Sequence, residues 1–159
     1  MLQLAYMRCA DKELAEDLVQ EACLKAYKSY MSKDFEITSP KSWLFKILVN
    51  THIDHTRKKQ FNTIDASEID IPSRDITSGS VETNIFLGDL SNALKELEQE
   101  QRMVVYLADV KEFSYKEISE ILDIPLGTVM SRLYRARQTL RKLLKEKGYS
   151  RGKTKAEKS

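Results

Sequence analysis

The sequence contains few of the residues that mark secreted, zinc-binding or membrane-spanning proteins. Its 159 residues include only two cysteines, Cys9 and Cys23, and these form no CxxC pair. Such sparse cysteine supplies neither a disulfide framework nor a zinc site, and it fits the reducing cytoplasm. There is also no secretory signal and no apolar run approaching about 18 residues, so we expect no membrane insertion and no export by that route.

Glycine and proline are also scarce, with five and three residues, and no segment alternates apolar and polar side chains over the length of a strand. Apolar residues recur instead at helical spacing, which argues against a β-rich fold. We therefore predict an all-α fold of two small helical domains joined by a flexible acidic linker. Helices are expected near residues 12–30, 40–59, 89–110 with a break near 98–101, 114–122 and 128–147.

Charge is distributed unevenly along the chain. Residues 61–90 hold six acidic side chains and one basic one, whereas residues 124–159 hold eleven basic and two acidic ones. Residues 61–85 are rich in serine, threonine and aspartate and lack helical periodicity, so we interpret them as the flexible linker. A packed irregular segment of one domain is the alternative. The basic C-terminal part indicates a polyanionic partner, although a basic tail alone can serve solubility.

Residues 114–147 have the pattern of a helix-turn-helix. Ser114 and Glu117 stand at the spacing of a capping box, DIPLG at 123–127 forms a turn, and a long basic helix follows. On that helix an apolar side faces the core. Its opposite side carries the candidate DNA-binding residues, because the first turns of such a helix enter the major groove, where arginine can pair with guanine. These residues are Thr128, Ser131, Arg132, Arg135 and Gln138. The alternative is a solvated basic face.

The helix expected at 40–59 has a second mixed face. Ser39 is placed to cap it and Pro40 suits its first position. One side carries a stripe of an aromatic ring, an amide and charged groups, which suits unstacked bases and their phosphates. We expect Asp54 to orient Arg57 or Lys58 rather than to touch nucleic acid. The stripe comprises Trp43, Lys46, Asn50, Asp54 and Arg57.

Two stretches resemble a known family. The run SYKEISEILDIPLGTVMSRLYRARQTLRKLL resembles the C-terminal DNA-binding region of bacterial RNA polymerase sigma factors of the extracytoplasmic-function (ECF) type, which is group 4 of the sigma-70 family. AEDLVQEACLKAY and SPKSWLFKILVNTHIDHTRKK resemble its N-terminal promoter-melting region. The resemblance implies a region 2-like domain at 1–60 and a region 4-like domain at 86–148, on either side of the linker at 61–85. Residues 149–159 lack a core pattern, so we expect them to form a disordered basic tail.

The resemblance also implies a function and its residues. The chain would bind core RNA polymerase, recognise the −35 and −10 promoter elements and promote DNA opening for transcription initiation. The loop 34–39 and the following helix would capture the −10 element as single strand, with Asn50 on a base edge and Lys46, Arg57 and Lys58 on phosphates. A cognate anti-sigma factor is a further expected partner. The polymerase-binding face would comprise Asp17, Gln20, Glu21 and Leu24.

Other functions remain alternatives. An autonomous helix-turn-helix regulator would bind a palindromic operator without polymerase. An interaction protein that uses the helix-turn-helix only for protein contacts has less support from the basic charge. His52 and His55 could share a helical face, but no third ligand accompanies them, so we predict no metal site. No nucleophile–base constellation or glycine-rich phosphate loop is present, so we predict no catalysis and no cofactor.

Some positions depart from the family pattern. The family's first helix begins before the residues matching LQLAYMRCADKELAEDL, so the N-terminus is expected to be shortened or to lack a turn of packing. Glu98 stands where proline is common, and Glu112 and Asp123 replace frequent glycines at helix ends. Aspartate tolerates the left-handed backbone conformation better than glutamate does.

Overall fold

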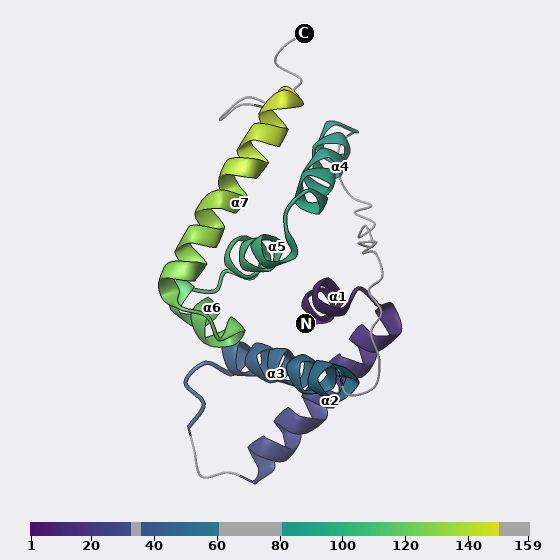
Figure 1. Ribbon diagram of the computed structural model, residues 1–159, viewed down its shortest axis with the longest axis vertical. Coiled ribbons are helices and arrows are strands. Elements are labelled where there is room, and N and C mark those ends of the chain that lie inside the picture. Colours follow the sequence, from purple (N-terminus) through teal and green to yellow (C-terminus); the bar gives the residue numbers. More distant parts are fainter. Residues whose placement is uncertain (33–35, 61–80, 150–159) are drawn as a thin grey trace.

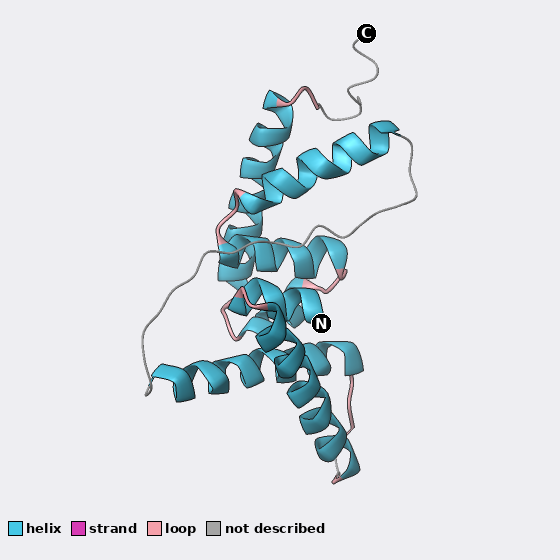
Figure 2. Ribbon diagram, turned by 90° about the vertical axis from the view of Figure 1, so that its right-hand side faces the viewer, coloured by secondary structure: helices cyan, strands magenta, loops and turns pink. Residues whose placement is uncertain are grey.

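The regular structure of the protein is helical throughout the described residues, which are 1–32, 36–60 and 81–149 of a computed structural model. Figure 2 shows the helices and the short loops between them. The predicted all-α fold is confirmed. The predicted linker falls mostly outside the described residues. The elements are α1 (Leu2–Cys9), α2 (Lys12–Met31), α3 (Pro40–Gln60), α4 (Val81–Lys95), α5 (Gln99–Val105), η1 (Tyr106–Val110, a π-helical turn), α6 (Tyr115–Leu122) and α7 (Leu126–Glu146).

The first two helices are separated by a sharp local break. Ala10 ends α1 in the left-handed conformation, with φ of 56°. Asp11 then caps α2, and its Oδ1 accepts a hydrogen bond from the backbone N–H of Leu14 at 3.0 Å. The sequence predicts the start of α2 after Asp11, but an alanine gives no signal for the break that makes α1 a separate helix.

A buried arginine organises the break between α4 and α5. Arg102 is only 7% exposed, and its Nη2 donates to the carbonyl oxygens of Lys95 at 3.2 Å and Leu97 at 2.7 Å. The guanidinium therefore satisfies carbonyls that the end of α4 leaves without helical partners. The break comes at residues 96–98, slightly before the predicted position, and α4 begins at Val81, inside the range predicted as linker.

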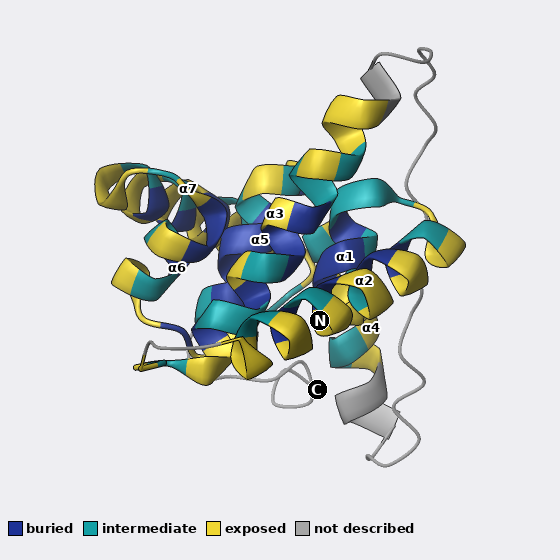
Figure 3. Cartoon of the chain, turned by 90° about the horizontal axis from the view of Figure 1, so that it is seen from below, coloured by how far each residue is buried: buried dark blue, intermediate teal, exposed yellow. Residues whose placement is uncertain are grey.

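The helices form two halves that share one hydrophobic core. The first half consists of α1–α3 and the second of α4–α7 with η1. Buried Leu4, Leu18 and Leu48 of the first half belong to the same cluster as Val104 and Ile118 of the second. Contacts between the halves run from α3 to α6 and from α1 to α5 (Figure 1). In Figure 3 the buried residues of α1, α3 and α5 lie near the centre of the chain. The two predicted units are therefore packed against each other.

The last described residue belongs to the fold rather than to a tail. Tyr149 was expected at the start of the disordered tail 149–159. Its hydroxyl donates to Oδ2 of Asp89 at 3.0 Å, and its ring meets Phe86 edge to face at 5.1 Å between centroids. These contacts tie the end of α7 to α4. None of the described helices is long and apolar enough to span a membrane.

Two of the unusual helix ends carry the backbone strain that the sequence suggests. Glu112 and Asp123 have φ of 59° and 54°, the left-handed region in which glycine is most favourable. Asp123 ends α6, and its N–H donates to the carbonyl of Ser119. Glu112 is exposed and precedes the α6 cap.

Replacing Glu112 with glycine is expected to raise the free energy of unfolding by about 0.5–1 kcal/mol, because glycine adopts this conformation without the Cβ penalty. Urea denaturation measures the change. Glu16→Gly, at an exposed position inside α2, is the matched control and should lower stability by about 1 kcal/mol. Equal destabilisation by both substitutions would contradict the strain at Glu112.

Candidate nucleic-acid interface

The helix-turn-helix is built as the sequence predicts. Ser114 Oγ accepts from the N–H of Glu117 at 3.3 Å, and Glu117 Oε2 accepts from the N–H of Ser114 at 2.9 Å, which completes the capping box. Asp123 then turns the chain into α7. Val129, Leu133 and Ala136 on the predicted apolar side of α7 are buried. The opposite side of the helix is therefore left for other contacts.

The structure divides the five candidate DNA-binding residues of α7. Ser131, Arg135 and Gln138 are exposed together, whereas Thr128 is half-buried. Arg132 is also half-buried, and its guanidinium forms an ion pair with Glu100 of α5. Its position lies between the buried side of the helix and Arg135, so it reaches the neighbouring helix. Arg135 is consequently the better-placed arginine for a base contact.

Several basic side chains near α7 hold the fold together. Arg137 forms a bidentate pair with Asp109 and donates to the hydroxyl of Tyr115 at 3.3 Å, and these bonds raise the pKa of the guanidinium. Lys147 pairs with Asp89 at 3.1 Å. In the described part of the chain, other exposed cations of α7 make no ion pair, so they are free to meet phosphates. These are Arg135, Arg141, Lys142 and Lys145.

Two large side chains outside the predicted DNA-binding set lie on the same exposed face. Met130 is 54% exposed and Tyr134 is 67% exposed, beside Ser131 and Arg135. Met130 and Tyr134 fall outside the helical spacing of the buried apolar residues of α7, and this spacing indicates that they are exposed. Exposed apolar groups on a helix that enters the major groove can contact the methyl group of thymine.

The stripe predicted on α3 is exposed over most of its length. Lys46, Asn50, Arg57 and Lys58 all lie at the surface, while Phe45, Leu48 and Val49 are buried on the other side. Trp43 is half-buried. Asp54 pairs with Lys25 of α2 at 3.5 Å, which corrects the expectation that it orients Arg57 or Lys58. The tertiary contact between α2 and α3 decides this pairing, and local spacing cannot reveal it.

The face predicted on α2 is also exposed. Asp17, Gln20, Glu21 and Leu24 lie at the surface, and Leu18 and Ala22 are buried opposite them. The exposed face continues beyond the predicted set. The large apolar residues Tyr27, Tyr30 and Met31 are more than half exposed near the end of α2. An exposed apolar face of this kind is typical of a protein-binding surface.

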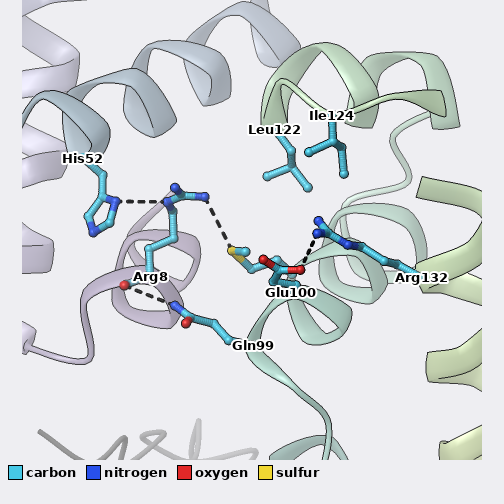
Figure 4. A pocket seen from close by; sticks show the side chains of 8 residues that line it. Arg8, His52, Gln99, Glu100, Leu122, Ile124 and Arg132 are labelled. Carbon is cyan, nitrogen blue, oxygen red and sulfur yellow. Dashed lines mark hydrogen bonds and ion pairs between the residues drawn. The ribbon is translucent and has the colours of Figure 1, made fainter. Parts of the chain in front are cut away.

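A pocket of about 330 Å³ lies where the halves meet (Figure 4). Arg8 enters it from α1, and its Nε donates to Nδ1 of His52 at 3.3 Å. Burial, followed by the charge of Arg8 and the neighbouring His55, lowers the pKa of His52 to about 4. The imidazole is therefore neutral near pH 7 and accepts from the guanidinium. On the opposite side of the pocket, Arg132 meets Glu100.

The histidine pair shows no further sign of metal binding among the described residues. One ring nitrogen of His52 is already engaged by Arg8. No group of three or more histidine, cysteine, aspartate or glutamate side chains gathers there as a metal would require. The described part of the chain also presents two exposed faces that combine cations with neutral hydrogen-bonding groups, one on α7 and one on α3.

Comparison with known proteins gives matches over both halves. Residues 1–62 match the family model of sigma-70 region 2, and residues 87–140 match that of sigma-70, region 4. ECF RNA polymerase sigma factor SigW of Bacillus subtilis is 33% identical over 91% of this chain and 82% of its own length. The ECF sigma factor SigE of Mycolicibacterium smegmatis is 34% identical, and the alignment spans 89% of this chain but only 56% of SigE.

Solved structures show the same fold. The sigma factor RpoE of Bartonella quintana, solved in complex with the anti-sigma factor NepR, superposes with a TM-score of 0.67 and 31% identity. That match covers 91% of this chain and 89% of RpoE. CnrH, solved with the cytosolic domain of CnrY, gives a TM-score of 0.54 at 22% identity and supports the fold alone.

Proposed function

The chain belongs to the ECF RNA polymerase sigma factors of the sigma-70 family, and from this premise we propose that it binds core RNA polymerase, recognises the −35 and −10 promoter elements and promotes DNA opening for transcription initiation. One observation carries the proposal above the others. Each half presents an exposed face that combines cations with neutral hydrogen-bonding groups, on α7 in one half and on α3 in the other. A promoter must be held both as duplex and as separated strands, and the two faces suit these two forms.

In this proposal α7 reads the −35 element. Arg135 contacts a guanine edge, Ser131 and Gln138 contact bases or phosphates nearby, and Thr128 lies at the entrance of the helix into the groove. Arg132 has a different role, because its guanidinium forms an ion pair with Glu100. It supports the position of α7 and reaches the DNA only when that ion pair is exchanged. Met130 and Tyr134 add apolar contacts on the same face.

On the first half, α3 holds the −10 element after strand separation. Asn50 contacts a base edge, and Lys46, Arg57 and Lys58 contact phosphates along the same exposed stripe. Each unstacked or flipped base costs a few kcal/mol. The contacts with the captured strand and with the polymerase offset that cost, so the free protein binds promoter duplex weakly.

The partners follow from the remaining surfaces. The α2 face of Asp17, Gln20, Glu21 and Leu24, extended by exposed Tyr27 and Met31, binds core polymerase in this proposal. The likeness to RpoE, which was solved with an anti-sigma factor, supports a cognate anti-sigma factor as a second partner. The chain then acts in the cytoplasm as a specificity subunit, and the chemistry of RNA synthesis belongs to the polymerase.

Reconstitution with core RNA polymerase tests the function. We expect promoter-specific run-off transcripts from DNA with suitable −35 and −10 elements, and none from polymerase alone. Binding of the free chain to the same duplex should be weak. A tight complex of the free chain with a palindromic duplex, without any promoter-specific transcript, would instead support an autonomous regulator.

Arg135→Ala is expected to weaken binding of the reconstituted holoenzyme to the −35 element by about 10- to 100-fold, because a bidentate arginine–guanine contact discriminates by about 1–3 kcal/mol. Competition binding with intact and altered −35 sequences measures the loss. Arg137→Ala removes the same charge two residues further along α7, at a side chain that pairs with Asp109. This control should leave the −35 preference in place. Equal loss of preference in both variants would remove Arg135 from the reading face.

Asn50→Ala is expected to lower the yield of open complex about tenfold while leaving polymerase binding and initial promoter binding unchanged, because its contact forms only with a captured base. Permanganate reactivity of unpaired thymines at the −10 element reports opening. Thr56→Ala, an exposed position on the same helix, is the control. An unchanged open-complex yield in Asn50→Ala would exclude the residue from strand capture.

A further inference from the structure

Arg8 carries a positive charge that no carboxylate in the described part of the chain neutralises. Its side chain is half-buried at the end of α1, where Nε donates to Nδ1 of His52 at 3.3 Å and Nη1 to the sulfur of Met103 at 3.7 Å. Both acceptors are neutral groups. A guanidinium has five N–H bonds, and the two on Nη2 meet no acceptor among the described residues. A charge withdrawn from water in this way is unfavourable until an anion meets it.

The other two arginines that are withdrawn from solvent in the described ranges both have oxygen acceptors. Arg102 donates to two backbone carbonyls, and Arg132 pairs with the carboxylate of Glu100. Burial lowers the pKa of Arg8, and no acidic neighbour opposes that effect. Arg8 therefore differs from both, because its guanidinium is placed for an anionic partner that the described residues do not supply.

The pocket that Arg8 enters has two cationic side chains and an apolar wall. Its volume is about 330 Å³, and Arg8 and Arg132 reach it from opposite sides (Figure 4). These two arginines and Glu100 leave the pocket with a net charge of +1. Leu122 and Ile124 line another side. Pockets of this size that combine apolar walls with a few polar groups are typical of small-molecule sites.

Contacts from the second half hold the backbone of Arg8 beside the pocket. Gln99, the first residue of α5, donates from Nε2 to the carbonyl oxygens of Met7 at 2.6 Å and Arg8 at 3.2 Å. The bond to His52 fixes the guanidinium as well. Because the arginine is already ordered, little conformational freedom is lost when a ligand binds to it.

We propose that this pocket is a binding site for a small organic oxyanion, whose phosphate or carboxylate head pairs with Arg8 and whose short apolar body packs against Leu122 and Ile124. A guanidinium binds either head through two parallel N–H···O bonds. Arg132 adds a second cation from the other half. A ligand that touches both halves stabilises the arrangement in which they meet. The site goes beyond the proposed function, because it requires neither DNA nor polymerase.

Calorimetric titration of the full chain tests the site with two pairs of probes. Phenyl phosphate is compared with inorganic phosphate, and benzoate with acetate. We expect one site per chain, at which the ring-bearing probe binds about tenfold more tightly than its partner, because the ring leaves water for an apolar wall. The tighter of phenyl phosphate and benzoate identifies the head group. Absence of saturable binding by all four probes would overturn the site, and equal affinity within both pairs would overturn the organic ligand.

Arg8→Gln is expected to weaken binding of the preferred probe by about 10- to 100-fold, because it removes charge-assisted hydrogen bonds. Circular dichroism checks that the variant keeps its helical content. Arg141→Gln removes the same charge at an exposed position of α7 outside the pocket, and this control should leave the affinity unchanged. Equal losses in the two variants would show unspecific attraction of anions and would overturn the site.

Glu100→Gln tests the pocket without loss of a buried group, because the Glu100 side chain is 60% exposed. Removal of its negative charge should tighten binding of the probe about threefold, as expected for a unit charge about 6 Å away in water. Glu96→Gln, an exposed position four residues earlier that does not line the pocket, should have no such effect. Weaker or unchanged binding in Glu100→Gln would contradict an anion held beside the two arginines.

The imidazole of His52 locates the bound probe, because this ring lines the pocket and is bonded to Arg8. Its nuclear magnetic resonance signals should shift in step with saturation of the wild-type chain. The same probe concentrations should leave them in place in Arg8→Gln. Saturable binding without a shift at His52 would place the anion elsewhere on the chain and overturn the assignment.

Discussion

The shared carboxylate of Glu117 links the local structure of the chain to its overall arrangement. Its place at the third position of α6 makes it the acidic partner of the capping box, which is a local requirement of that helix. Its second oxygen bonds to Ser39, whose carbonyl accepts the first backbone bond of α3. The N-termini of α3 and α6, each the positive end of a helix dipole, therefore meet at one negative group. The bond from Ser39 therefore joins the halves through a carboxylate that the capping box of α6 already uses.

The basic residues of the second half divide into those that fix the fold and those that remain available. Arg102 is buried and bonds to the backbone carbonyls of Lys95 and Leu97, and Arg137 pairs with Asp109. Arg132 of α7 forms an ion pair with Glu100 of α5. What remains on the surface of α7 is a narrower cationic face around Arg135 and the C-terminal lysines. A helix can therefore be both well packed and strongly basic, because part of its charge is neutralised internally and only the remainder meets a polyanion.

Local chemistry explains which features could be predicted from the sequence. The capping box at Ser114, the start of α2 after Asp11 and the apolar side of α7 depend on residues within one or two turns, and the sequence predicts them. The left-handed backbone at Glu112 and Asp123 was indicated only by the resemblance to a family with frequent glycines at these positions. The pairing of Asp54 with Lys25 and of Arg132 with Glu100 depends on helices distant in the chain. The packing of α6 on α3 is of the same kind. A face that is polar in the sequence can bind DNA, an internal carboxylate or water, and only the fold selects among them.

The packing of Phe45 of α3 against Phe113, in the segment before α6, affects how the halves can respond to a partner. Separation of the halves exposes the rings of Phe45 and Phe113 to water, and exposure of apolar area is unfavourable by about 25 cal/mol for each Å². The polar bonds fix direction, but they exchange readily for bonds to water and contribute little net stability each. A partner that opens the chain must therefore offer replacement apolar contacts. The first half already exposes Leu24, Tyr27 and Met31 on α2, away from the buried side of that helix. A partner bound only to this face of α2 leaves the contact between Phe45 and Phe113 intact. A partner that separates the halves must therefore hold the second half as well.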